Sequence, residues 1–89
     1  MQAMTTNMTG SRNSVVDSLR LSIEEKIPNA VAKVSGAGGH FSIEVVSPKF
    51  EGMSRLDSQR LVYSAITHLM LGDQAPVHAV DSLKTLTPT

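Results

Sequence analysis

The chain lacks cysteine altogether, and this absence removes several classes of site. Its 89 residues contain no Cys and no Trp. Disulfide bonds, a CxxC redox pair, a zinc knuckle and a cysteine nucleophile are therefore excluded. Any metal ligand that the chain itself supplies must be a histidine or a carboxylate, and the fold depends on packing alone.

An excess of charge of one sign is also missing. Eight Lys and Arg side chains balance eight Asp and Glu side chains. Dedicated nucleic-acid binders usually carry a basic excess, because neutralising phosphate supplies most of their non-specific affinity. The composition therefore disfavours that class, although a local basic face stays open as an alternative.

Long apolar runs are absent too, and none approaches the ~20 residues that span a bilayer. We therefore expect no membrane association and a cytoplasmic protein. Residues 1–13 have no apolar core of signal-peptide length, so we expect a disordered leader there. The leader contains no acidic residue, which leaves an organellar targeting segment as an alternative.

Hydrophobic spacing predicts a first helix over residues 14–27. Ser14 and Asp17 have the spacing of a capping box, with Asp in place of the usual Glu or Gln. Pro28 ends the pattern, because the residue before a proline is driven out of the helical region. Apolar residues recur at helical intervals at Val16, Leu19, Ile23 and Ile27.

Two short strands are predicted next, over residues 31–34 and 41–46. The glycine-rich segment 35–39 between them suits a hairpin connection, since glycine tolerates a positive φ. Phe41, Ile43 and Val45 alternate along the second strand, so we expect them to share the face that helices cover.

A second, longer helix and a third strand complete the pattern. Ser54 and Asp57 repeat the capping-box spacing, and Gly72 is expected near the end of the helix. Residues 77–80 are predicted as a strand. The expected apolar stripe of the helix is Leu56, Val62, Ala65, Ile66, Leu69 and Met70. The order α-β-β-α-β predicts an α+β fold in which a mixed three-stranded sheet carries both helices on one face.

Four sequence pieces, in order, resemble the signature of the BolA family, closest to its IbaG/YrbA-like branch. They are Gly39-His40-Phe41, Phe50-Glu51-Gly52-Met53-Ser54-Arg55, Gln59-Arg60-Leu61-Val62-Tyr63 and Val77-His78-Ala79-Val80, followed by Thr87-Pro88. The resemblance implies a class II KH-like fold and a BolA-like domain over residues 14–89.

The resemblance also implies a function without catalysis. Relatives pair with a monothiol glutaredoxin of the CGFS type, and the two proteins share a [2Fe-2S] cluster with glutathione. By this resemblance His78 is the expected cluster ligand and His40 the candidate second one. The implied partner-binding residues are Gly38, Gly39, His40, His78, Ala79 and Val80. A transient homodimer stays open.

The chain departs from the family spacing at one point. Relatives have about ten positions from the histidine of the third strand through the final proline, whereas His78 to Pro88 spans eleven here. One residue near Asp81 and Ser82 is therefore extra. An insertion of one residue reverses the facing of a strand unless a bulge absorbs it, so we expect a bulge or an early strand end.

Each candidate residue also has a plainer interpretation. By its spacing alone His78 is typical of a strand-end histidine satisfied by backbone, and His40 of an exposed residue at a hairpin end. His68 is expected on the flank of the long helix, with a structural role. No serine-histidine-aspartate order, P-loop, HExxH or paired-carboxylate pattern supports an enzyme.

The main alternative function is nucleic-acid binding by a KH-like regulator. Gly36-Ala37-Gly38-Gly39 matches the GxxG of KH domains, but that loop joins two helices and this one is expected to join two strands. Arg55 and Arg60 on the long helix are the candidate phosphate contacts, and Asp57 lies between them in the sequence.

Overall fold

A computed structural model describes the backbone of residues 14–89 and the side chains of residues 15–89. The elements are α2 (Ser14–Lys26), β1 (Val31–Ala37), β2 (His40–Val46), η3 (Pro48–Phe50), α3 (Arg55–Ile66), η4 (Thr67–Leu69) and β3 (Ala79–Leu86). The predicted α-β-β-α-β order is confirmed. The predicted leader and the side chain of Ser14 lie outside the described residues. Within the described part, no helix has the length and apolarity needed to cross a membrane.

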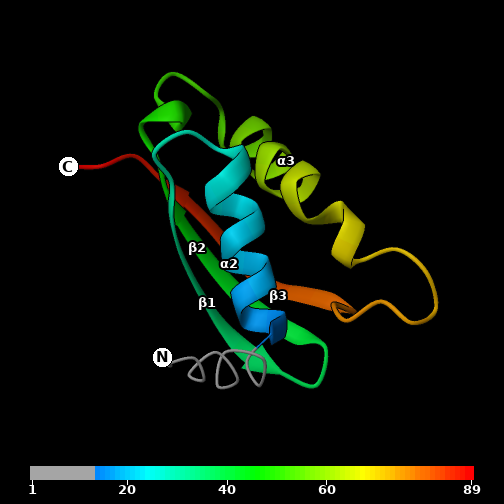
Figure 1. The fold of residues 1–89 in the computed structure, drawn as a ribbon. Coiled ribbons are helices and arrows are strands. Elements are labelled where there is room, and N and C mark those ends of the chain that lie inside the picture. Colours follow the sequence, from blue (N-terminus) through cyan, green and yellow to red (C-terminus); the bar gives the residue numbers. More distant parts are fainter. Residues whose placement is uncertain (1–13) are drawn as a thin grey trace, which may run out of the picture.

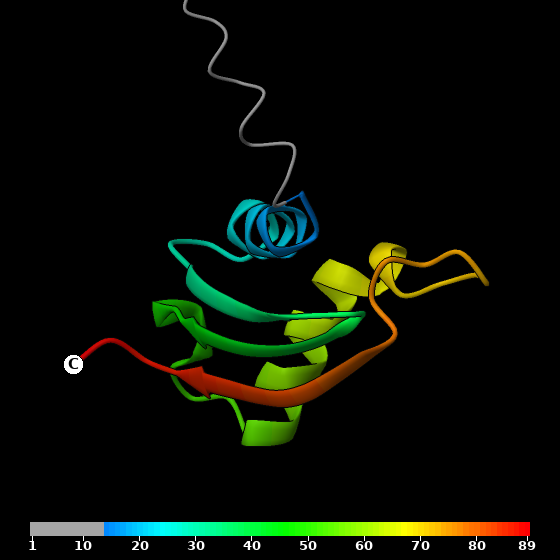
Figure 2. The same ribbon diagram turned by 90° about the horizontal axis from the view of Figure 1, so that it is seen from below.

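The sheet is mixed, as predicted. Its strand order is β1-β2-β3, with β1 antiparallel and β3 parallel to β2. Both helices lie on the same side of the curved sheet, α2 over β1 and α3 beside β3 (Figures 1 and 2). The core between these layers consists of Leu19, Ile23, Ile27, Ala32, Phe41, Ile43, Val45, Phe50, Val62, Ala65, Ile66 and Val77.

The two faces of β2 differ in the way that alternation predicts. Phe41, Ile43 and Val45 are buried against the helices, and His40 is exposed on the opposite face. That face is polar. Cross-strand partners there include the row Lys33, Glu44 and Lys84 and the row Ser35, Ser42 and Ser82. His40 therefore stands on the open face of the sheet.

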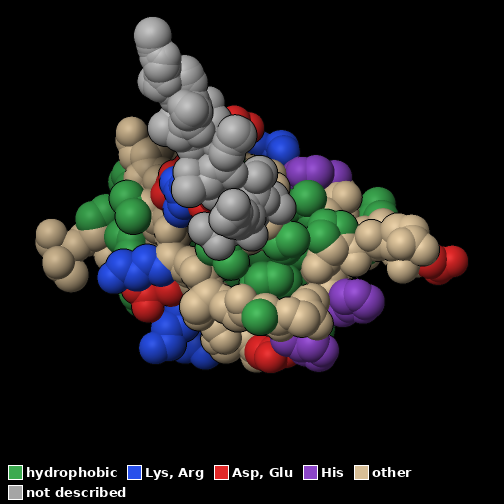
Figure 3. All heavy atoms as spheres, turned by 60° about the horizontal axis from the view of Figure 1, so that its bottom comes forward, with side chains coloured by type: hydrophobic (Ala, Val, Ile, Leu, Met, Phe, Trp, Pro, Cys, Tyr) green, Lys and Arg blue, Asp and Glu red, His purple; other side chains and the backbone are tan. Residues whose placement is uncertain are grey.

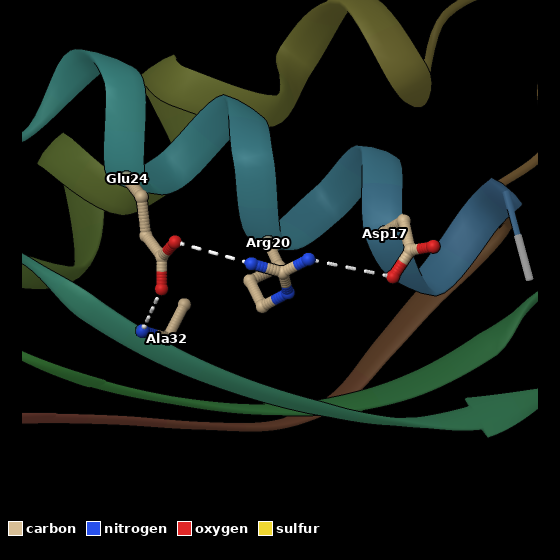
Figure 4. A network of polar contacts seen from close by, with 4 residues as sticks. All are labelled: Asp17, Arg20, Glu24 and Ala32. Carbon is tan, nitrogen blue, oxygen red and sulfur yellow. Dashed lines mark hydrogen bonds and ion pairs between the residues drawn. The ribbon is translucent and has the colours of Figure 1, made fainter. Parts of the chain in front are cut away.

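Helix α2 also protects the outer edge of β1. The Oε2 atom of Glu24 accepts a hydrogen bond of 3.0 Å from the backbone N–H of Ala32. Its Oε1 atom lies 3.3 Å from Arg20, which also contacts Asp17 at 3.5 Å (Figure 4). A free N–H on an edge strand is a point where another strand can pair, so the carboxylate closes that point.

The hairpin between β1 and β2 is tighter than the predicted loop over residues 35–39. Strand β1 continues to Ala37, and only Gly38 and Gly39 form the turn, with φ of 65° and 84°. Positive φ at both central residues matches the twist of the flanking strands. The predicted hairpin is confirmed, and the GxxG sequence does not join helices. The loop boundary was wrong because Gly36 stays in the strand, where a Cβ would collide with the backbone of His40.

Helix α3 begins as predicted and ends earlier. The Ser54 hydroxyl caps it by accepting a 3.0 Å hydrogen bond from the Asp57 N–H. The α-helix ends at Ile66, and the 3-10 helix η4 follows it up to Leu69. Helical structure therefore ends before Gly72. Leu56 was wrongly assigned to the apolar stripe. It is 56% exposed, because the buried face runs through Ser58 and Val62, about half a turn away.

Ser47 fixes the far end of the sheet. It is fully buried, and its hydroxyl donates to the Pro28 carbonyl at 2.7 Å while accepting from the Lys49 N–H at 3.0 Å. Its own N–H donates to the Leu86 carbonyl at 2.9 Å. One residue thus joins the segment before β1, the turn after β2 and the end of β3.

Candidate functional site

His78 lies immediately before β3 rather than inside the strand predicted over residues 77–80. Strand β3 begins at Ala79. The reason is a contact with the hairpin turn, since the Gly39 carbonyl accepts from both the His78 N–H at 2.8 Å and the Ala79 N–H at 3.0 Å. Val77 is buried and donates to the Leu69 carbonyl at 3.1 Å instead of joining the ladder.

The imidazole of His78 is exposed and packs on the hairpin turn. A Cβ at Gly39 would collide with the ring of His78, so the ring occupies the space that a side chain would need. Among the described residues, neither ring nitrogen of His78 has a hydrogen-bond partner. The turn therefore anchors the backbone of His78 and packs against its ring, while no described residue bonds to either ring nitrogen.

The extra residue of the sequence is absorbed by a β-bulge. Phe41 pairs with Val80, and Ser42 pairs with Ser82, so Asp81 has no partner across the parallel ladder. The predicted bulge is confirmed. The other expectation, an early strand end, is wrong, because β3 continues in register to Leu86.

The bulge places Asp81 beside His40. The Nδ1 atom of His40 lies 3.2 Å from Oδ1 of Asp81, and the two side chains are 60% and 57% exposed. His40 pairs with Ala79 in the sheet, so it is adjacent in the ladder to the residue that follows His78. The two predicted ligand residues therefore stand at the same end of the sheet.

Among the described residues, this end of the sheet offers the imidazoles of His40 and His78 as ligands for metals such as iron. Histidine side chains appear on one side of the molecule, near exposed hydrophobic side chains (Figure 3). No group of three or more His, Asp or Glu side chains among the described residues could hold a metal ion. This end of the sheet thus offers at most two imidazoles, those of His40 and His78, as candidate ligands.

The predicted partner-binding residues surround this site. Gly38 and His40 are exposed, while Gly39 and Ala79 are half-buried. Val80 differs from the others, because it pairs with Phe41 and packs against the core. It is nevertheless half-buried like Gly39 and Ala79.

His68 belongs to a different environment. It lies in η4, exposed, with Nε2 3.3 Å from the hydroxyl of Ser22 on α2. This contact joins the two helical segments. It agrees with the structural role expected for His68, although the residue lies beyond the end of α3.

The two arginines of the nucleic-acid alternative are also separate from the hairpin end. Both are exposed on α3. Arg55 lines a shallow groove between α3 and β3 together with Gln59, Leu83, Lys84, Thr85 and Leu86. Arg60 is not part of that groove, so the described residues give the alternative one arginine and one lysine in a shared hollow.

Two features of the site were not anticipated from the sequence. The double acceptor role of the Gly39 carbonyl has no sequence signal, because it depends on how two distant segments meet. Asp81 was located as an insertion but not as the partner of His40. The signal that could have found it is the bulge itself, since a bulged residue is freed from the ladder and often re-aims a side chain next to a functional site.

Comparisons with known proteins agree with this fold. The family model described as BolA-like protein matches residues 14–89. Mouse (Mus musculus) "BolA-like protein 1" is 43% identical over 61% of the chain and 36% of its own length. "Acid stress protein IbaG" of Escherichia coli (strain K12) is 40% identical over 62% of each protein. The chain therefore matches about a third to two thirds of these relatives.

A solved structure gives the same result in three dimensions. A BolA protein homologue from Coxiella burnetii superposes with a TM-score of 0.68 at 37% identity, over 81% of this chain and 88% of that one. By its sequence and by its fold, the chain belongs to the BolA-like family.

Proposed function

We propose that the chain is a non-enzymatic adaptor that binds a monothiol glutaredoxin of the CGFS type and shares a labile [2Fe-2S] cluster with it. The observation that carries the proposal is the setting of His78. Its ring is exposed and packs on Gly39, neither ring nitrogen is bonded to a described residue, and its backbone is anchored to the same turn. A ligand held in this way needs little ordering when a partner arrives.

The donor set fits a shared cluster and not a cluster held by this chain alone. Iron-sulfur clusters are usually bound through thiolates, and the chain has no cysteine. The missing sulfur ligands would come from the glutaredoxin and from glutathione. When bound, the cluster would supply one-electron chemistry and a transferable iron-sulfur unit. Imidazole ligation raises its potential relative to ligation by thiolates alone.

The residues of this chain would provide ligands and a docking surface. His78 is the proposed firm ligand and His40 the proposed second one. Gly38, Gly39 and Ala79 form the small surface between them, where the absence of bulky side chains lets a partner approach closely. The proposed role is iron-sulfur trafficking or iron sensing. The relative named as an acid stress protein suggests stress as a setting for it.

The test is reconstitution with a CGFS glutaredoxin, glutathione, iron and sulfide, followed by visible absorption and circular dichroism. We expect a mixed complex with the wild-type chain and an altered spectrum with His78→Ala. His68→Ala is the matched control, since it removes an exposed histidine that contacts Ser22 on α2 and is not among the predicted ligands. An unchanged spectrum in His78→Ala would show that His78 is not a ligand, and failure of the wild-type chain to form any complex would refute the function.

The alternative function, nucleic-acid binding, has its own readout. A DNA titration at several salt concentrations would give a steep dependence if phosphates were neutralised at Arg55, Arg60 or nearby lysines. Micromolar affinity that falls in Arg55→Ala and Arg60→Ala would favour that function. We expect weak binding with no effect of these substitutions.

A further inference from the structure

Asp81 stands out because it belongs to the bulge and to no pair in the ladder. Among the described residues its carboxylate has one polar contact, between Oδ1 and Nδ1 of His40 at 3.2 Å. A bulged residue can be lost without breaking the register on either side, so the fold does not need an aspartate there. The carboxylate is instead placed beside one of the two candidate ligands.

The direction of this contact decides which nitrogen of His40 is available. A carboxylate accepts hydrogen bonds, so in neutral His40 the proton belongs on Nδ1, where it is donated to Asp81. The lone pair is then on Nε2. The hydrogen bond made by one ring nitrogen sets the state of the other in this way, and ligating histidines commonly donate their second N–H to a carboxylate.

The fold does not need the contact between Asp81 and His40 for its stability. Both side chains are more than half exposed, and an ion pair or hydrogen bond in that setting contributes little to folding. Lys84, the nearest cation along β3, faces Glu44 across the ladder rather than Asp81. The contact orients a ring on the open face, 41 residues away in sequence, without adding to the core.

We propose that Asp81 is a positioning residue that holds the proton of His40 on Nδ1 and so presents Nε2 as the second imidazole ligand of the shared site. This inference rests on the proposed function for the identity of the metal centre, and on the geometry alone for the state of His40. The positioning role thus belongs to Asp81, the residue by which this chain exceeds the spacing of the family.

The first experiment examines the free protein and does not depend on any cluster. Long-range ¹H–¹⁵N spectra, recorded at a pH where the histidines are neutral, report the tautomer of each ring. We expect wild-type His40 to carry its proton on Nδ1 and Asp81→Ala to lose that preference, while His78 is unchanged. Asp73→Ala removes an equal charge from an exposed loop position and should leave His40 as in the wild type. A wild-type His40 protonated mainly on Nε2 would overturn the inference.

The second experiment measures the mixed complex with glutaredoxin. Loss of an outer carboxylate partner typically weakens metal binding by about 10- to 100-fold. We expect Asp81→Ala to shorten the lifetime of the cluster by about that factor and to change its spectrum, and Asp73→Ala to do neither. An Asp81→Ala complex with the wild-type lifetime and spectrum would overturn the positioning role. A wild-type chain that never forms the complex would instead refute the proposed function, and the tautomer measurement would still stand.

Discussion

The ring of His78 lies against the Cα of Gly39, in the space that any larger residue would fill. The same glycine also has a φ of 84° and accepts two backbone hydrogen bonds through its carbonyl. Gly39 therefore provides the positive φ of the turn, the space for the His78 ring and the anchor for the His78 backbone.

Gly39→Ala should displace His78 as well as strain the turn. A residue with a Cβ pays about 1–2 kcal/mol in the left-handed region. Gly38→Ala is the matched control, because its φ is 65° and a Cβ there would meet no atom within 4 Å. We expect the free energy of unfolding in urea to fall further for Gly39→Ala and only that variant to shift the ring resonances of His78. Equal losses with unmoved resonances would contradict the contact.

Glu24→Ala should destabilise the fold through the edge of β1. Its carboxylate is the partner of the Ala32 N–H, and removing one partner of a partly buried hydrogen bond costs about 1–3 kcal/mol. Glu24→Gln keeps an acceptor oxygen and should lose less. Arg20→Ala removes only the exposed ion pairs, for which about 0–1 kcal/mol is expected. Equilibrium urea unfolding would rank the three variants, and a larger loss in Arg20→Ala than in Glu24→Ala would refute this account.

Ser58 and Thr85 should be energetically coupled. Their hydroxyl oxygens lie 2.6 Å apart, and Ser58 also donates to the Arg55 carbonyl at 2.9 Å. Since Ser58 has one proton, Thr85 is the donor between the two hydroxyls. Ser58→Ala and Thr85→Val should each cost about 1 kcal/mol, and the double variant less than their sum. Strict additivity in a double-mutant cycle would argue against the shared hydrogen bond.

Deletion of Asp81 should leave the fold intact. The bulged residue has no partner across the ladder, so its loss joins two segments that are already in register. We expect a cooperative thermal transition close to that of the wild type and a dispersed NMR spectrum. Deletion of Leu83 is the control, because it reverses the facing of the rest of β3 and should unfold or severely destabilise the chain. Similar damage from both deletions would contradict the bulge.

Local patterns predicted much of this fold. The alternation of β2 placed Phe41 and His40 on opposite faces, and the capping-box spacing placed Ser54 at the start of α3, because both signals are carried by residues close in sequence. The parallel pairing of β3 also followed, since a helical crossover leaves few other arrangements.

Sequence patterns did not predict the contacts between segments that are far apart in the chain. The start of β3 depends on the Gly39 carbonyl, and the burial of Ser58 depends on Thr85, 27 residues away. A serine has no apolar signature, so Leu56 was assigned to the stripe in its place. The Asp81–His40 contact joins two strands through a bulge whose presence was predictable but whose side-chain direction was not.

The hydrogen bonds of Ser47 hold one end of the sheet more tightly than the other. Ser47 joins three segments through hydrogen bonds at the end opposite to His78. Amide exchange should therefore be slowest around Ser47 and Val46 and fastest in the exposed loop before Val77, because local opening follows the density of buried contacts. Docking of a partner at the hairpin end would then slow amide exchange at the end of the sheet that Ser47 does not hold.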